Sequence, residues 1–237
     1  YIQLCIIFLF LSVVLIALSA AHSAKQNQLW ISLSKETAHQ LGTPISSLEA
    51  WTVLLEQHNT PPELLQELQK DVHRLQLVAD RFSKIGSTPK LEVQDLSQLV
   101  ARIKDYMQVR APKHVRIDCI ANETPISIPM SATLIEWVIE NLLRNALDAM
   151  THKGVILISL QKEDKQVVID ISDTGKGMSK AQAKQIFKPG FTTKKRGWGL
   201  GLSLTKRIIE EYHKGKIELI KSEQGKGAVF QITLKVI

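Results

Sequence analysis

The sequence predicts three parts: a transmembrane helix over residues 1–24, an α-helical hairpin over residues 25–88 that forms a four-helix bundle in a homodimer, and an α/β sandwich over residues 89–237. Three observations predict this order. The first 24 residues are mostly apolar and contain no charged side chain. Apolar residues then recur at helical spacing, and from residue 115 onward strand-like and helical patterns alternate.

Residues 1–24 are long enough to cross a bilayer, because about 20 apolar residues span the roughly 30 Å of hydrocarbon. Lys25 and Lys35 follow, and basic residues after a span favour a cytoplasmic location for the chain downstream. A secretory signal peptide, cleaved near the small residues 19–24, is one alternative, although no basic stretch precedes the apolar run. A buried core helix is the other. Because the chain begins with Tyr1, we expect further sequence upstream.

The composition limits the classes of function. Two cysteines, Cys5 and Cys119, exclude a disulfide scaffold and a cysteine-based zinc cluster. The formal net charge is +7, and the basic surplus lies between residues 184 and 226. A nucleic-acid partner is not expected, because neither interleaved aromatic residues nor a groove-reading helix accompanies these charges. A phosphate ligand or a membrane surface explains them more simply.

Two helices joined by a short turn are expected over residues 25–88. Asn59–Pro62 interrupts the helical pattern, and a proline suits the first turn of the second helix. The second helix carries a heptad-like apolar seam: Leu65, Leu68, Val72, Leu75, Ala79 and Phe82. One hairpin cannot bury such a seam alone, so two hairpins in a homodimer are predicted. Packing against the rest of the same chain is the alternative.

Gly86–Pro89 is expected to be a linker, and an α/β pattern follows it. Strands are expected over residues 115–120, 154–160, 166–171, 216–221 and 228–236, with helices over 134–150 and 202–212. Residues 173–200 are rich in glycine and basic residues, which predicts a loop that becomes ordered on binding.

Three features in this part point to a nucleotide. Asp173 follows a strand, where its carboxylate can accept a hydrogen bond from the amine of adenine, and guanine would present an oxygen instead. Gly175 and Gly177 would let the backbone approach the ring. Asn141 and Asn145 share one helix face, and amide oxygens suit Mg²⁺.

The third feature is a glycine run that leads into a helix, with Gly197, Gly199 and Gly201 at alternate positions. Exposed backbone N–H groups at a helix start bind phosphates. Taken singly, the three features could be a turn, a solvated helix face and a flexible loop. Their order and spacing together are specific to nucleotide binding.

These segments resemble the boxes of bacterial two-component sensor histidine kinases, over nearly all of residues 25–237. Glu140–Ala146 is similar to the N box, and Asp173–Met178 to the first glycine box. Phe187–Thr193 is similar to the F box, Gly197–Leu202 to the second glycine box, and Gly225–Phe230 to the last.

The resemblance implies a Bergerat-type α/β sandwich with helices on one side of a mixed sheet and ATP under a mobile lid. It implies that Asn145 binds Mg²⁺ and that Asp173 binds adenine. Lys194, Lys195 and Arg196 would lie in the lid, where they either meet the triphosphate or are solvated.

Composition alone does not distinguish the seven histidines. Glu36–Pro44 resembles the H box, which implies that His39 is the residue phosphorylated. The family usually has a carboxylate after this histidine to accept a proton, whereas this chain has Gln40, and Glu36 on the same helix face is the substitute we consider. Thr43 matches the position that the family uses for phosphatase activity.

The resemblance therefore implies a homodimeric kinase in the bacterial inner membrane, with its kinase domains in the cytoplasm. It would phosphorylate itself from ATP and pass the phosphoryl group to an aspartate in the receiver domain of a separate response regulator. Two alternatives stay open. One is a gyrase-like ATPase, in which Glu140 would be one residue out of phase with the position of the water-activating acid. The other is an ATP-switched scaffold without catalysis, which the Gln40 substitution leaves open.

Overall fold

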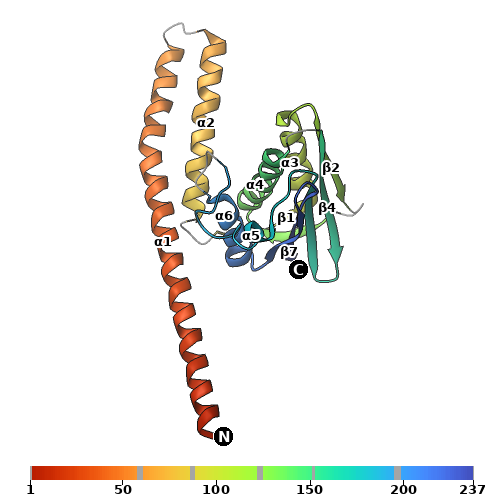
Figure 1. Cartoon of the computed structure of the whole chain (residues 1–237). Helices are drawn as coiled ribbons and strands as arrows, with labels where there is room; N and C mark the ends of the chain where they lie inside the picture. The colour runs from red at the N-terminus through yellow and green to blue at the C-terminus, as the bar shows by residue number, and fades with distance from the viewer. Residues whose placement is uncertain are drawn as a thin grey trace. The chain divides into compact units, whose positions relative to one another are not determined.

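The computed structural model describes residues 2–57, 61–85, 89–121, 125–150, 153–194 and 199–236 (Figure 1). Within the helices, the backbone alone is described for several stretches, of which residues 19–40 are the longest. The chain divides into two compact units, Tyr1–Thr88 and Pro89–Ile237.

The first unit is a hairpin of two helices, α1 (Ile2–Glu56) and α2 (Pro62–Ile85). The second helix begins at Pro62, as the proline pair predicts. Ile45 and Thr52 of α1 and Val72 of α2 are buried where the two helices pack together. Other members of the predicted seam are less covered, and the side chain of Leu75 stays 41% exposed.

The long helix α1 is continuous. It runs across residue 25, where the predicted transmembrane helix meets the predicted hairpin, and it continues through Pro44. Among the described residues, no helix is both long and apolar enough to cross a membrane. The transmembrane helix expected over residues 1–24 is therefore not confirmed.

The second unit is built on a five-stranded sheet with the order β2-β4-β5-β7-β6. Its strands are β2 (Val115–Ala121), β4 (Gly154–Glu163), β5 (Gln166–Asp173), β6 (Lys216–Glu223) and β7 (Gly227–Lys235). Only β2 and β4 are parallel, and the other neighbours pair antiparallel. Fully buried and half-buried side chains alternate along β4, because one face of the sheet packs against helices. All five strands were predicted, with ends that differ by a few residues.

Two long helices, α3 (Leu96–Arg110) and α4 (Ala132–Ala149), lie against the sheet (Figure 1). The sequence analysis anticipated α4 and missed α3, whose N-terminus is capped by the Asp95 carboxylate. It also missed the small antiparallel pair of β1 (Glu92–Asp95) and β3 (Ser127–Met130). The helices and the sheet enclose one continuous apolar core.

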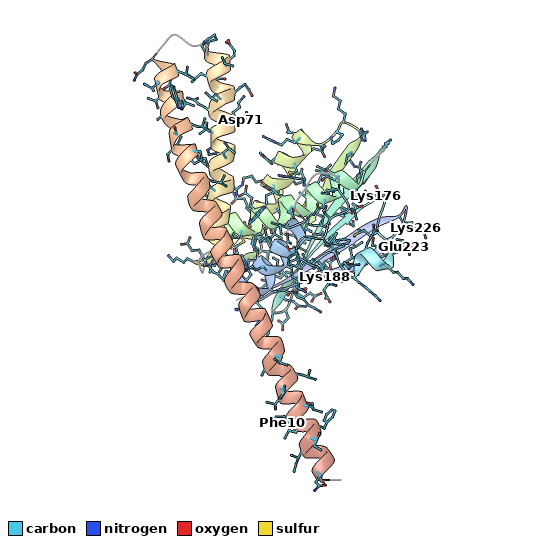
Figure 2. The ribbon with its side chains drawn as sticks, turned by 60° about the vertical axis from the view of Figure 1, so that its left-hand side comes forward. Phe10, Asp71, Lys176, Lys188, Glu223 and Lys226 are labelled. Atoms are coloured by element: carbon cyan, nitrogen blue, oxygen red, sulfur yellow. The ribbon has the colours of Figure 1, made fainter. Side chains whose placement is uncertain are left out.

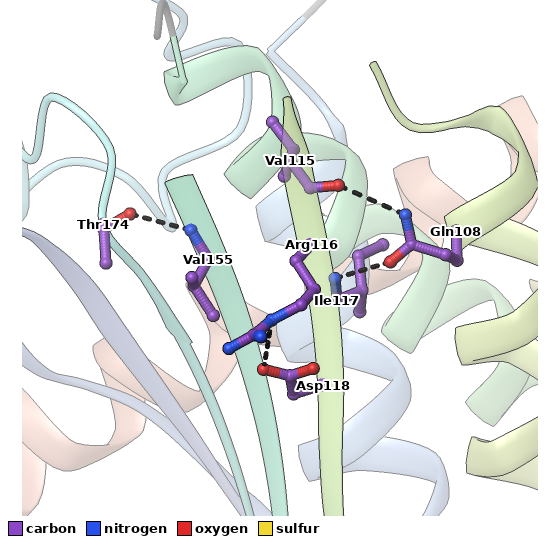
Figure 3. A network of polar contacts seen from close by, with 7 residues as sticks. All are labelled: Gln108, Val115, Arg116, Ile117, Asp118, Val155 and Thr174. Carbon is purple, nitrogen blue, oxygen red and sulfur yellow. Dashed lines mark hydrogen bonds and ion pairs between the residues drawn. The ribbon is translucent and has the colours of Figure 1, made fainter. Parts of the chain in front are cut away.

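Helix α3 is fixed to the edge strand β2 through one side chain (Figure 3). The amide of Gln108 donates to the carbonyl of Val115 at 3.2 Å and accepts from the N–H of Ile117 at 2.7 Å. These two bonds satisfy backbone groups on the open edge of the sheet. On the same strand, Arg116 and Asp118 form an ion pair at 2.9 Å.

The segment after β5 holds more regular structure than the predicted loop. It contains one short helix, α5 (Lys180–Ala183), which begins with a capping box between Ser179 and Gln182. The helix expected over residues 202–212 is present in two parts. The first is α6 (Gly201–Arg207), and the second is a π-helical turn, η1 (Ile208–Tyr212).

Candidate nucleotide site

The candidate site is built around the turn that follows β5. The Asp173 carboxylate accepts a hydrogen bond from the N–H of Gly175 at 2.8 Å, which closes a turn at the strand end. The N–H of Lys176 donates to the carbonyl of Ala149 at the end of α4, at 3.0 Å. The carbonyl of Lys176 accepts from the N–H of Gly225 at 2.8 Å. The turn is thus fixed between α4 and the β6–β7 connection.

The same end of the sheet carries charged side chains from three segments. Figure 2 shows Lys176, Glu223 and Lys226 gathered there, and Lys226 pairs with Glu223 at 2.6 Å. Close backbone contacts explain the glycines in this region. A Cβ on Gly177, whose φ is 60°, would lie 1.9 Å from the carbonyl oxygen of Glu223. One on Gly227 would lie 1.8 Å from the carbonyl oxygen of Asp173.

These distances give a reason for the glycines of the Asp173–Gly177 turn that differs from the one predicted from the sequence. The sequence analysis assigned Gly175 and Gly177 to the approach of a nucleotide ring. In the structure, Gly177 faces the chain's own backbone, and a Cβ on Gly175 would lie 2.8 Å from the Asp173 carboxylate. Both glycines are required by the fold itself, and their contact with a nucleotide stays a prediction.

A cavity of about 290 Å³ opens beside the turn. It is lined by Ala149, Met150, Lys153, Thr174, Gly175, Lys176 and Gly225. Burial raises the pKa of the neighbouring Asp173 above its ordinary value, while the hydrogen bonds from Gly175 and Ala228 lower it. The arrangement offers a partly desolvated acceptor next to a hollow, which suits recognition of a base amine.

The two predicted asparagines of α4 have different partners. Asn141 donates to the hydroxyl of the buried Thr205 in α6, at 2.9 Å. Its amide oxygen lies beside Gly201, where a Cβ would come within 2.6 Å. Asn141 thereby holds the start of α6 against α4. The amide oxygen of Asn145 instead accepts a hydrogen bond from Lys194 at 2.8 Å.

Lys194 connects this asparagine to a residue that the sequence analysis did not single out. Its Nζ also lies 2.6 Å from an oxygen of Asp148, which is one turn after Asn145 on α4. Because the ammonium group of Lys194 contacts both the Asn145 and the Asp148 oxygen, the two oxygens can bind one cation together. An amide oxygen and a carboxylate oxygen are ligands that Mg²⁺ favours, so this pair fits such an ion.

The segment that carries Lys194 is closed at its base by two glycines. The N–H of Gly190 donates to the carbonyl of Gly199 at 3.1 Å, and a Cβ on Gly199 would meet the backbone of Gly190 at 2.4 Å. Helix α6 begins two residues later, at Gly201, as the glycine run predicts. The predicted site residues Lys195, Arg196 and Gly197 lie outside the described residues.

The predicted phosphoacceptor segment belongs to the other unit. His39, Glu36, Gln40 and Thr43 all fall within the helical backbone of α1. Their side chains lie outside the described part of the structure. Their roles therefore stay predictions.

Comparison with known proteins agrees with this fold. Residues 130–237 match the family model of histidine kinase-, DNA gyrase B-, and HSP90-like ATPases. The sensor histidine kinase ZraS of Salmonella typhi is 32% identical over 86% of this chain and 45% of its own length. Sporulation kinase C of Bacillus subtilis is 27% identical over 90% of this chain and 51% of its own length. The chain thus spans about half the length of these relatives.

Among solved structures, the catalytic domain of histidine kinase ThkA superposes with a TM-score of 0.57 at 26% identity, over 62% of this chain and 96% of that domain. Full-length ShkA in complex with AMPPNP superposes with a TM-score of 0.66 at 21% identity, over 86% of this chain and 45% of ShkA, which shows the shared fold. Residues 130–237 accordingly form a domain of the histidine kinase-, DNA gyrase B-, and HSP90-like ATPase type, and the chain is similar in sequence to bacterial sensor histidine kinases.

Proposed function

We propose that this protein is a homodimeric sensor histidine kinase, which transfers the γ-phosphoryl group of ATP to His39 and from there to an aspartate of a separate response regulator. One observation carries the proposal. A partly buried carboxylate at the end of β5, two oxygens of α4 that converge on Lys194 and a glycine-rich helix start occur in one ATPase-type unit, in a chain whose other unit carries a histidine in a segment that resembles the H box.

The chain's own residues would perform separate tasks in binding ATP. Asp173 would accept from the exocyclic amine and select adenine over guanine. The backbone N–H groups that precede and begin α6 would bind phosphate oxygens. The amide oxygen of Asn145 would bind Mg²⁺, which neutralises charge on the transferring phosphoryl group when it is present. The bond from Asn141 to Thr205 would keep α4 and α6 in register during this binding.

His39 would act as the nucleophile. A neutral imidazole, with an unperturbed pKa near 6.5, has a nitrogen lone pair available at neutral pH. As its bond to phosphorus forms, the bond from phosphorus to the ADP oxygen breaks. Gln40 can orient the ring by accepting its N–H but is no useful base, so Glu36 is the proposed substitute. Thr43 is proposed to support hydrolysis of the phosphorylated regulator.

Two features of the first unit support a homodimer. The seam of α2 is only partly covered by α1, and Leu75 stays 41% exposed. Apolar side chains of α1, including Trp51, Val53 and Leu54, are also exposed. A second hairpin would bury these surfaces in a four-helix bundle.

A membrane location is a separate part of the proposal. The described side chains between Ile6 and Leu18 are almost all apolar and more than half exposed, and Phe10 in Figure 2 is one of them. Contact with lipid would bury this surface. The stretch is shorter than a full span of about 20 residues. Separation of membranes from cytosol in cells that produce the chain, with the protein detected in each fraction, tests this part.

The kinase proposal is tested by incubating the full chain with γ-labelled ATP and Mg²⁺, beside His39→Ala and Gln40→Glu variants. We expect label that is labile in acid, stable in alkali and lost in His39→Ala. Faster labelling of Gln40→Glu would identify the missing base as limiting. Transfer of the label to a receiver domain then tests the partner.

The other functions give different results in the same assay. A gyrase-like ATPase would release phosphate without forming phosphohistidine. For that reaction Glu140 is poorly suited, because its side chain is buried on the core side of α4. A scaffold would bind ATP with neither product, and either outcome would reject the kinase proposal.

A further inference from the structure

The contact of Lys194 with α4 suggests a competition within the chain. Its Nζ lies 2.8 Å from Oδ1 of Asn145 and 2.6 Å from Oδ2 of Asp148, two residues that precede it by 49 and 46 positions. We propose that Asn145 and Asp148 form one cation site, which Lys194 occupies when nucleotide is absent and a divalent cation with ATP occupies when nucleotide is bound. The inference rests on the proposed ATP-binding function.

One positive charge is enough to fill the site. Lys194 provides a single ammonium group, and both oxygens lie within hydrogen-bonding distance of it. A metal ion bound to the same amide oxygen would sit about 2.1 Å from it. Two cations within a few ångströms repel each other strongly, so the lysine and the metal exclude each other.

The carboxylate of Asp148 is the charged partner that keeps Lys194 at Asn145, because a neutral amide alone holds an ammonium group weakly. When Lys194 leaves, the same carboxylate faces the metal directly or through one of the waters that Mg²⁺ retains. Asp148 therefore acts as a positioning residue in both states.

The competition between Lys194 and Mg²⁺ is weak. The side chains of Lys194 and Asp148 are 42% and 47% exposed, so solvent screens their attraction. A pair of this kind shifts an equilibrium by about two- to fivefold. This is enough to raise the Mg²⁺ concentration that ATP binding requires without preventing binding.

The test measures ATP binding by the full chain at increasing Mg²⁺ and in EDTA. We compare the unchanged chain with Lys194→Met, and use Lys180→Met in α5 as the matched control. We expect Lys194→Met to lower the Mg²⁺ concentration at half-maximal binding by about threefold, with metal-free ATP binding unchanged. In the Asp148→Asn background the same substitution should have a smaller effect, because the two residues act as a pair.

A second readout uses the nucleotide-free protein. Acetylation of individual lysines, followed by mass spectrometry, reports how freely each ammonium group reacts. Lys194 should react faster in Asp148→Asn than in the unchanged chain, whereas Asp164→Asn in the β4–β5 turn should leave its rate unchanged.

Three outcomes would overturn the inference. An unaltered Mg²⁺ requirement in Lys194→Met would make the contact an ordinary surface ion pair. Weaker ATP binding with and without Mg²⁺ would mean that Lys194 serves the triphosphate only. Equal acetylation of Lys194 in the unchanged chain and in Asp148→Asn would mean that Asp148 does not hold the lysine. In each case the unchanged chain still binds ATP. If that chain binds no ATP at any Mg²⁺ concentration, the proposed function itself fails.

Discussion

Asn141 in α4 donates from Nδ2 to the hydroxyl of Thr205 in α6 at 2.9 Å, although the two residues are 64 positions apart in the chain. Thr205 is 2% exposed, so water cannot reach its hydroxyl in place of Asn141 without rearrangement. The sequence analysis treated Asn141 as a ligand of the nucleotide. The structure gives one end of its amide a structural task, which is to hold the start of α6 beside α4.

The bond between Asn141 and Thr205 predicts an indirect loss of nucleotide binding. Thr205→Val keeps the shape of the side chain but leaves the amide of Asn141 without its acceptor. We expect the second unit to lose about 1–3 kcal/mol of unfolding free energy and ATP binding to weaken with it. Hydrogen exchange of peptides from α4 and α6 measures the first effect, and ATP titration the second. Thr233→Val, at a half-buried position in β7, should leave both nearly unchanged.

The β6–β7 turn offers two glycines with similar backbone angles and different surroundings. Gly225 and Gly227 have φ values of 77° and 85°. A Cβ on Gly225 would meet nothing within 4 Å, whereas one on Gly227 would lie 1.8 Å from the carbonyl oxygen of Asp173. Gly225→Ala should therefore cost about 1 kcal/mol from backbone strain alone.

Gly227→Ala should cost about 3 kcal/mol or more, because steric overlap adds to the same strain. Chemical denaturation followed by hydrogen exchange in β5 and β7 compares the two variants. Equal losses of stability would show that the turn can move away from Asp173, and the close contact would then not constrain the site.

Asp173 should set the preference for adenine. In Asp173→Asn one oxygen becomes an amide N–H₂, which repels the exocyclic amine of adenine. We expect the Kd for ATP to rise by about tenfold to a hundredfold and the discrimination against GTP to shrink. Asp170→Asn in the same strand is the control, because its oxygen can still accept from Gln231.

Binding should also depend on pH through Asp173. Burial raises the pKa of this carboxyl, so its protonation begins at a higher pH than that of an exposed aspartate. Protonation removes the charged acceptor, and ATP affinity should fall as the pH falls through this raised pKa. Titration of ATP binding between pH 7.5 and 4.5 tests this. The fall should be smaller in Asp173→Asn, and an identical profile would exclude Asp173 as its source.

The elements that sequence predicted best carry strong local signals. Helix α2 was located because Pro62 starts it and an apolar seam follows. Strands β4 and β5 were located by short runs of apolar, β-branched residues. Helix α3 had comparable signals, namely Asp95 as N-cap and a buried face that includes Leu99 and Ile103. Helix α3 was therefore predictable from its own sequence.

The missed parts of the site depend on contacts between distant segments. Asp148 is a half-exposed acid on a helix, and such residues are usually only solvated. It became a candidate site residue only through its ion pair with Lys194. Thr205 likewise gains its role from Asn141. No local pattern in one sequence reveals such pairs. By contrast, Asp173 could be singled out as a candidate from sequence because its strand, its turn and its glycines are adjacent in the chain.

His213 should make the second unit sensitive to mild acid. Its Nε2 accepts from the N–H of Ser131 at 3.1 Å, so Nδ1 carries the proton and donates to the carbonyl of Ile208 at 2.8 Å. Burial lowers the pKa of this imidazole. The unfolded chain therefore binds a proton near pH 6.5 while the folded unit does not, and stability present above that pH is lost as the pH falls toward the lowered value. Hydrogen exchange at the start of α4 should accelerate between pH 7 and 5.5, after correction for intrinsic rates. His213→Gln, which cannot titrate, should remove this extra acceleration, whereas His114→Gln at an exposed position should not.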